Sequence, residues 1–184
     1  GIEVAKGDIL YFLNADDVLY HPSTISNIVK HFSDDDFDFL YCDILMFDKH
    51  TGQCHIKKHN RVNKTFLYTN AIPQQAVFYR RRAFEKCGNF STEYKIVSDR
   101  DWLLKAFLKH KLKSKYVGIP AALFTQGGLS NNEKYETLHA QERQRMKKAY
   151  FNNFLVSLSA NFLPKPLKYA LMKLIKICNA VLNK

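Results

Sequence analysis

The chain has 184 residues, a length that suits one domain with an appendage. Hydrophobic residues make up 46% of it and aromatic residues 14%, which is enough for a packed core and excludes a disordered tail. The net charge of +11 is concentrated in residues 141–184, where nine Lys or Arg stand against the single acid Glu142, so we expect an ordinary main body and no nucleic-acid partner.

The cysteines point to a reducing compartment. All four are widely spaced and none forms a C-x-x-C pair, which argues against a zinc site or a disulfide framework and favours a cytoplasmic protein. No uncharged run approaches the length of a membrane span. The chain begins at Gly1, without an initiator Met and just before a core strand, so we expect it to be a fragment that lacks an upstream part.

The first informative element is an apolar run, residues 9–13, which ends directly before Asn14, Asp16 and Asp17. The run is too short for a typical helix and predicts a fully buried strand of a parallel sheet. Ligands bind at the carboxyl ends of strands in open α/β sheets, and carboxylates there are costly unless a hard cation with substrate phosphates meets them. The buried strand favours such a metal site. The alternative is that Asp16 and Asp17 open a turn or cap the next helix.

Helical and strand patterns alternate after the acidic pair. Ser23 is the expected N-cap of a helix whose apolar positions are Ile25, Ile28, Val29 and Phe32. Residues 37–47 predict a strand, and residues 53–58 are expected to pair back on it as a hairpin. Residues 59–72 are polar and predict an irregular loop of the kind that covers a site.

Residues 74–79 predict another strand, entered from Pro73. A short basic helix follows at residues 80–86, and Gly88 is the expected residue after its end.

Ser98 and Asp101 have the spacing of a capping box, with Ser98 as N-cap. The helix that they begin has the apolar face Trp102, Leu103, Ala106 and Phe107. Residues 116–124 predict a strand that Pro120 interrupts, and residues 134–159 have a helical pattern.

The final segment, residues 164–184, forms an amphipathic pattern when it is wound as a helix. Its lysines, Lys165, Lys168, Lys173 and Lys176, fall within an arc of about 140° at the helical increment, opposite a Leu/Ile face. Such a helix suits an anionic membrane surface. The same pattern is equally typical of a helix that packs on its own domain or on a subunit, because an amphipathic face does not identify its partner.

The order of these segments resembles the middle of a family 2 glycosyltransferase with the GT-A fold. The resemblance covers residues 1–135 and rests on four segments in the family's order, which are residues 1–17, 74–81, 88–99 and 127–130. It implies an α/β fold, a partial GT-A (Rossmann-like) mixed sheet flanked by helices, with a helical extension at the C-terminus. The expected domains are residues 1–135 and residues 136–184. The family's first strand and nucleobase-binding region are expected upstream of Gly1.

The resemblance implies transfer of a sugar from a nucleotide-sugar donor to a hydroxyl acceptor. In this family an acidic motif, commonly D-x-D, holds Mn²⁺ or Mg²⁺ against the donor diphosphate. Asn14 stands at the first acidic position of that motif, so the metal contact is expected from Asp16 and Asp17, with Asn14 beside them. A cation there would neutralise the charge that develops on the leaving diphosphate.

Asp99 matches the residue that serves as catalytic base in inverting members of the family. Its place in the first turn of a helix is expected to stabilise the ionised carboxylate, and complementing that helix terminus is the alternative role. Asp101 is the rival base, although its capping position already gives it a structural role. Gln74 and Gln75 correspond to acceptor-pocket positions, or simply begin the strand.

The Q-x-x-R-W pattern of processive synthases is absent, since the only Trp is Trp102. We therefore expect a single-addition enzyme at the cytoplasmic membrane face, acting on a lipid-linked or surface-glycan acceptor. A phosphoryl-transfer enzyme using the same acidic pair is a second possibility, but no Gly-rich phosphate loop supports it. The non-enzymatic alternative is a basic module that binds membrane or nucleic acid through its C-terminal helix.

Overall fold

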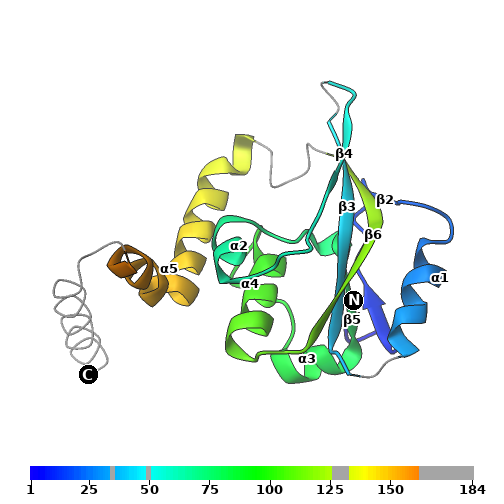
Figure 1. The fold of residues 1–184 in the computed structure, drawn as a ribbon, viewed down its shortest axis with the longest axis horizontal. Coiled ribbons are helices and arrows are strands. Elements are labelled where there is room, and N and C mark those ends of the chain that lie inside the picture. Colours follow the sequence, from blue (N-terminus) through cyan, green and yellow to red (C-terminus); the bar gives the residue numbers. More distant parts are fainter. Residues whose placement is uncertain (34–35, 49–50, 126–132, 162–184) are drawn as a thin grey trace. The chain divides into compact units, whose positions relative to one another are not determined.

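The computed structural model describes residues 1–33, 36–48, 51–125 and 133–161. A mixed sheet forms its centre, with the strand order β1-β5-β3-β6-β2 and with β4 paired to β3 (Figure 1). The strands are β1 (Ile9–Tyr11), β2 (Val18–Leu19), β3 (Phe39–Phe47), β4 (Cys54–Lys57), β5 (Val77–Arg80) and β6 (Ser114–Thr125). β3 and β6 are parallel, and the other pairs are antiparallel.

Helices cover both faces of this sheet, which confirms the predicted mixed sheet flanked by helices. The α-helices of the described residues are α1 (Thr24–Val29), α2 (Lys64–Thr69), α3 (Arg81–Cys87), α4 (Ser98–Leu104) and α5 (Glu136–Asn161). Figure 1 shows α1 on one side of β3 and β6, with α2 and α4 on the other. The chain divides into two compact units after Gln144, and the site described below lies in the first.

The strict alternation along β3 explains how one strand supports two cores. Phe39 and Tyr41 face the cluster that contains Trp102 of α4, whereas Leu40 and Cys42 face the cluster formed with α1. Trp102 is only 1% exposed, and its ring lies edge-on to Phe39 at 5.9 Å between centroids. The sheet face under α4 is therefore fixed by large aromatic side chains.

The first strand differs from its prediction. β1 pairs antiparallel with β5, joining Leu10 to Tyr79, so the predicted parallel pairing is wrong. Leu10 is its one buried residue, and Ile9 and Tyr11 are half-buried. Leu10 packs into the core under α4 while Ile9 and Tyr11 pack on the core under α1. An apolar run thus indicates that both faces of the sheet are covered at this strand, but it does not indicate whether the strand is parallel or antiparallel.

Two segments from the middle of the chain also differ. Residues 59–72 contain helix α2, whose N-cap Asn63 accepts a 2.8 Å hydrogen bond from the backbone N–H of Phe66, so the predicted irregular loop is wrong. Gln74–Ala76 is a 3₁₀ turn, and β5 begins only at Val77, so the predicted strand starts too early. The physical reason is a turn after Pro73, whose carbonyl accepts from the N–H of Ala76.

The remaining helix and strand predictions are largely confirmed. The hairpin of β3 and β4 forms, and Gly88 follows α3 with φ +80°, a conformation that favours glycine. β6 continues through Pro120 by a bulge opposite β3 instead of stopping there. Ser23 precedes α1 but makes no side-chain cap bond, and Ile25 and Val29 are exposed in place of their predicted burial.

Two predicted features, the segment 127–130 and the amphipathic helix at residues 164–184, lie outside the described residues. None of the helices that the structure describes combines the length and the apolar character needed to cross a bilayer.

Candidate functional site

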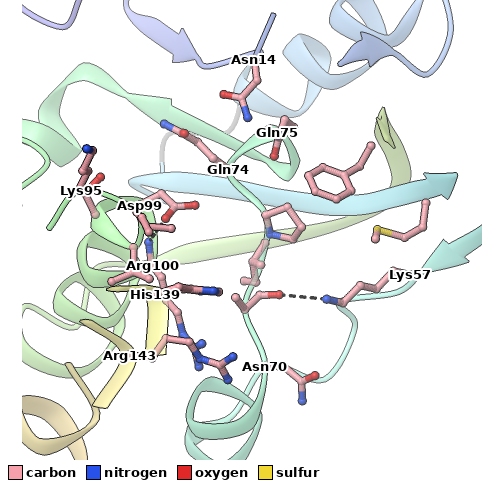
Figure 2. A pocket seen from close by; sticks show the side chains of 18 of the residues that line it. Asn14, Lys57, Asn70, Gln74, Gln75, Lys95, Asp99, Arg100, His139 and Arg143 are labelled. Carbon is pink, nitrogen blue, oxygen red and sulfur yellow. Dashed lines mark hydrogen bonds between the residues drawn. The ribbon is translucent and has the colours of Figure 1, made fainter. Parts of the chain in front are cut away.

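A cavity of about 750 Å³ opens in the first compact unit, and Figure 2 shows the side chains around it. Five of the six residues singled out from the sequence line it, namely Asn14, Asp16, Gln74, Gln75 and Asp99. These residues come from three separate stretches of the chain. The structure therefore brings the predicted site residues together, and their chemical roles stay predictions.

The acidic pair divides into one exposed and one buried carboxylate. A tight turn follows β1, in which the N–H of Asp17 donates to the carbonyl of Asn14 at 3.1 Å. Asp16 is exposed and lines the cavity. Asp17 is only 6% exposed, and its carboxylate accepts a short hydrogen bond from the side-chain amide of Gln75. The sequence left both carboxylates as equal candidates, but in the structure only Asp16 faces the cavity.

The turn at residues 74–76 is tied to the acidic loop from two directions. Gln75 donates from its side chain to Asp17, and its backbone carbonyl accepts from the hydroxyl of Tyr11 at 2.9 Å. Gln75 is 2% exposed as a result. Gln74, next to it, is half-buried on the cavity wall. Gln75 thus fixes the relative position of the two loops.

Asp99 lies in the first turn of α4, half-buried on the cavity wall. Its carboxylate accepts from the backbone N–H of Arg100 at 2.7 Å. Burial raises the pKa of Asp99, and hydrogen bonds from backbone N–H groups and the Arg100 charge only partly oppose that rise. The hydrogen bonds at the start of the helix favour the ionised form, and desolvation, which is the larger effect, opposes them.

The predicted capping box at the start of α4 is also wrong. Val97 occupies the N-cap position and Ser98 is already the first helical residue. The backbone N–H of Asp101 donates to the carbonyl of Val97 at 2.9 Å, and Asp101 is 8% exposed. The backbone N–H groups just before this helix are bound instead by a side chain from another helix.

Glu142, on α5, is the residue that holds this loop. Its carboxylate accepts from three successive backbone N–H groups, those of Lys95 at 2.8 Å, Ile96 at 2.9 Å and Val97 at 3.2 Å. Glu142 is 8% exposed, so these bonds lie in a largely desolvated place. Sequence reasoning missed this role, although one signal existed, since Glu142 is the single acid among the bases of residues 141–184.

Basic side chains form the other part of the cavity wall. They are Lys57, Lys95, Arg100, His139 and Arg143. Arg100 is 8% exposed, and burial together with the charge of Arg143 lowers its pKa to about 10. None of these basic residues was identified from the sequence, because they come from four different elements or loops and share no motif.

The acidic end of the cavity offers a limited set of metal ligands. Nowhere in the described residues do three His, Cys, Asp or Glu side chains gather as a metal cage. Asp16 and Asn14 supply hard oxygen ligands at the cavity wall. Mg²⁺ commonly binds through one or two carboxylates together with substrate phosphates. The residues present therefore fit a cation that a bound diphosphate completes, and they do not fit a closed protein site.

Comparison with known proteins identifies the chain's relatives. The sequence profile of the family described as "Glycosyl transferase family 2" matches residues 1–97, which include Asn14, Asp16, Asp17, Gln74 and Gln75 and end two residues before Asp99. Curated proteins of Mycobacterium bovis and Mycobacterium tuberculosis named "PGL/p-HBAD biosynthesis glycosyltransferase" are 29% identical over 133 residues. The match covers 71% of this chain and 50% of each relative, so the chain spans about half their length.

Solved structures of S. aureus TarS share the fold. The complex of TarS with UDP-GlcNAc superposes with a TM-score of 0.53 at 16% identity, over 69% of this chain and 37% of TarS. The complex with UDP superposes with a TM-score of 0.51 at 14% identity, over 92% of this chain and 46% of TarS.

Proposed function

This chain belongs to glycosyl transferase family 2, and on that premise we propose that it transfers a sugar from a nucleotide-sugar donor to an acceptor hydroxyl at the cavity around Asp16 and Asp99. Membership confirms the resemblance found in the sequence and makes the chain part of an enzyme, which removes the support for a purely basic binding module. The observation that carries the proposal is the shared cavity, in which an exposed carboxylate and a half-buried one line the same wall.

Asp16 is the proposed contact to Mn²⁺ or Mg²⁺, with the Asn14 amide oxygen beside it. When bound, the cation would neutralise the charge that develops on the leaving nucleoside diphosphate. Asp17 has a different task in this proposal. Because it is buried against Gln75, it holds the acidic turn in place and leaves Asp16 directed at the cavity.

Asp99 is the proposed base of an inverting reaction. Its carboxylate takes the proton of the acceptor hydroxyl as that oxygen attacks the anomeric carbon of the donor. The bond from that carbon to the diphosphate oxygen breaks, and the electron pair leaves with the nucleoside diphosphate. Burial favours this role, because it raises the pKa of Asp99 and so strengthens it as a base.

The acceptor side is proposed from the sequence and from the relatives. We propose a single addition to a lipid-linked or surface-glycan acceptor at the cytoplasmic membrane face, with the half-buried Gln74 near the acceptor, whereas the buried Gln75 holds the acidic turn. Relatives named for PGL/p-HBAD biosynthesis support a biosynthetic transfer. The basic residues 164–184 are the proposed membrane contact.

The direct test is turnover of nucleotide sugars by the full-length protein. UDP-GlcNAc is the first probe, because the similar TarS structure binds it, and a panel of other nucleotide sugars follows. We expect release of the nucleoside diphosphate that EDTA abolishes and added Mn²⁺ or Mg²⁺ restores. Turnover that is unaffected by EDTA contradicts the metal site, and no turnover with any member of the panel contradicts the proposed function.

A further inference from the structure

Three of the basic side chains, those of Arg100, His139 and Arg143, lie together at one end of the cavity. Figure 2 shows Asn14 and Gln75 at one end and Arg143 at the opposite end, with Asp99 between them on the wall. Arg100 and His139 lie on the Arg143 side of Asp99 in the same view. A second charged region is therefore separate from the acidic end where the donor diphosphate is expected.

These cations lie close enough to one another to interact unfavourably. Burial and the charge of Arg143 both lower the pKa of Arg100, and the charge of Asp99 only partly offsets them. Burial and the charge of Arg100 likewise lower the pKa of Lys57. No carboxylate of the described residues forms an ion pair with Arg100 or Arg143. Like charges held together in a partly desolvated place are unfavourable unless an anion meets them.

Arg100 is fixed in position but incompletely satisfied. Its Nη2 atom donates to the carbonyls of Leu67 at 3.1 Å and Tyr68 at 3.3 Å, at the end of α2. Its Nε atom is buried and has no hydrogen-bond partner within the described part of the chain. Arg100 is more than nine-tenths buried and lines the cavity wall, so an incompletely hydrogen-bonded guanidinium group is held at the cavity.

We propose that Arg100, Arg143 and His139 form a subsite for an anionic group of the acceptor, a phosphate or a carboxylate, on the side of Asp99 away from Asp16. Guanidinium groups bind such planar or tetrahedral anions in a bidentate way. An acceptor anchored there would present its hydroxyl towards Asp99. This inference rests on the proposed function, because it assigns the acceptor side of the same cavity.

The alternative occupant is the donor diphosphate itself, and the position of the cations argues against it. The acidic turn, which the proposed function assigns to the donor and its cation, is at the other end of the cavity. Arg143 also lies on α5 one residue after Glu142, the clamp of the loop before Asp99. The subsite for the anion is thus built on the same turn of α5 that positions the proposed base.

The test uses Arg143→Gln in the full-length protein, with Arg61→Gln as the matched control. Arg61 is exposed, carries the same charge and does not line the cavity. Inorganic phosphate is the probe, and its affinity is measured from the rise in Tm at constant ionic strength. We expect the control to match the wild type and Arg143→Gln to bind phosphate about tenfold more weakly or worse, with Arg143→Lys between them. Equal phosphate affinity in all variants overturns the subsite.

A second measurement separates the acceptor from the donor. The Kd for UDP with Mg²⁺ is expected to be unchanged in Arg143→Gln, and a tenfold loss would assign these cations to the donor and overturn the inference. Failure of the wild type to bind UDP counts against the proposed function, while the phosphate result still decides the subsite.

Vesicles of phosphatidylcholine with and without phosphatidic acid then identify the source of the anion. These vesicles are compared for the wild type and Arg143→Gln once phosphate binding has been shown to depend on Arg143. Binding that requires phosphatidic acid and Arg143 indicates a lipid phosphate, and binding that is indifferent to Arg143 indicates a soluble anionic acceptor.

Discussion

At the scale of single residues, neighbouring carboxylates have different surroundings and hence different expected tasks. Asp16 is exposed at the cavity, whereas Asp17 is buried and bonded to Gln75. A buried carboxylate with an amide partner stabilises the fold, and an exposed one next to a cavity is available to a ligand. The roles of these two identical side chains can therefore be distinguished by experiment.

Replacing each carboxylate by Ala should give opposite results. Asp16→Ala should lower metal-dependent turnover by about 100-fold while leaving Tm unchanged, since exposed substitutions seldom alter stability by more than about 0.5 kcal/mol. Asp17→Ala leaves the Gln75 amide buried without its acceptor, which costs about 1–3 kcal/mol and lowers Tm by several degrees. Thermal unfolding and nucleotide-sugar turnover measure the two effects. A stable Asp17→Ala protein together with an unfolded Asp16→Ala protein contradicts this division.

At the scale of elements, the loop before α4 depends on a helix that is distant in sequence. The carboxylate of Glu142 on α5 accepts from the N–H groups of Lys95, Ile96 and Val97, just before Asp99. Backbone N–H groups at the start of a helix have no partner within the helix, and Val97 at the N-cap of α4 supplies no side-chain cap. The position of Asp99 therefore depends on α5.

Glu142→Gln tests this dependence, and Glu136→Gln on the same helix is the matched control because Glu136 is exposed. The new amide directs an N–H group at backbone N–H groups, so we expect a loss of about 1–3 kcal/mol in the free energy of unfolding. A displaced Asp99 should also lower kcat by about tenfold or more, with the KM for the donor nearly unchanged. If Glu142→Gln matches Glu136→Gln in both unfolding and kcat, the clamp is unimportant.

The elements also show what the sequence could predict. The apolar pattern identified β3, the face of α4 around Trp102 and the end of α3 at Gly88, because these depend on neighbours in the chain. The antiparallel pairing of β1, the turn at Gln75 and the cap of α4 depend on residues up to 71 positions away, such as Arg80 paired with Ile9. No local pattern carries that information.

At the scale of the whole molecule, the sheet brings distant segments to one cavity. The turn after β1, the turn before β5, the start of α4 and the start of α5 all contribute to its wall. The family motifs predicted the first three of these segments. The fourth, with His139 and Arg143, was missed, because a basic helix is ordinarily a solvated face and only the structure places it beside Asp99.

The central claim is that Asp99 removes a proton in this cavity, and the pH dependence of Asp99→Asn tests it most directly. Only the ionised carboxylate acts as a base, and burial raises its pKa. In the wild type, log kcat should therefore rise with pH and level off above the ordinary Asp value of about 4. Asp99→Asn should keep the Kd for UDP, and its rate of sugar transfer should be lower by about 100-fold or more. Its log kcat should no longer fall at low pH, which is the acid limb of the wild-type profile. Transfer by Asp99→Asn at the wild-type rate, with the same acid limb, would contradict the account.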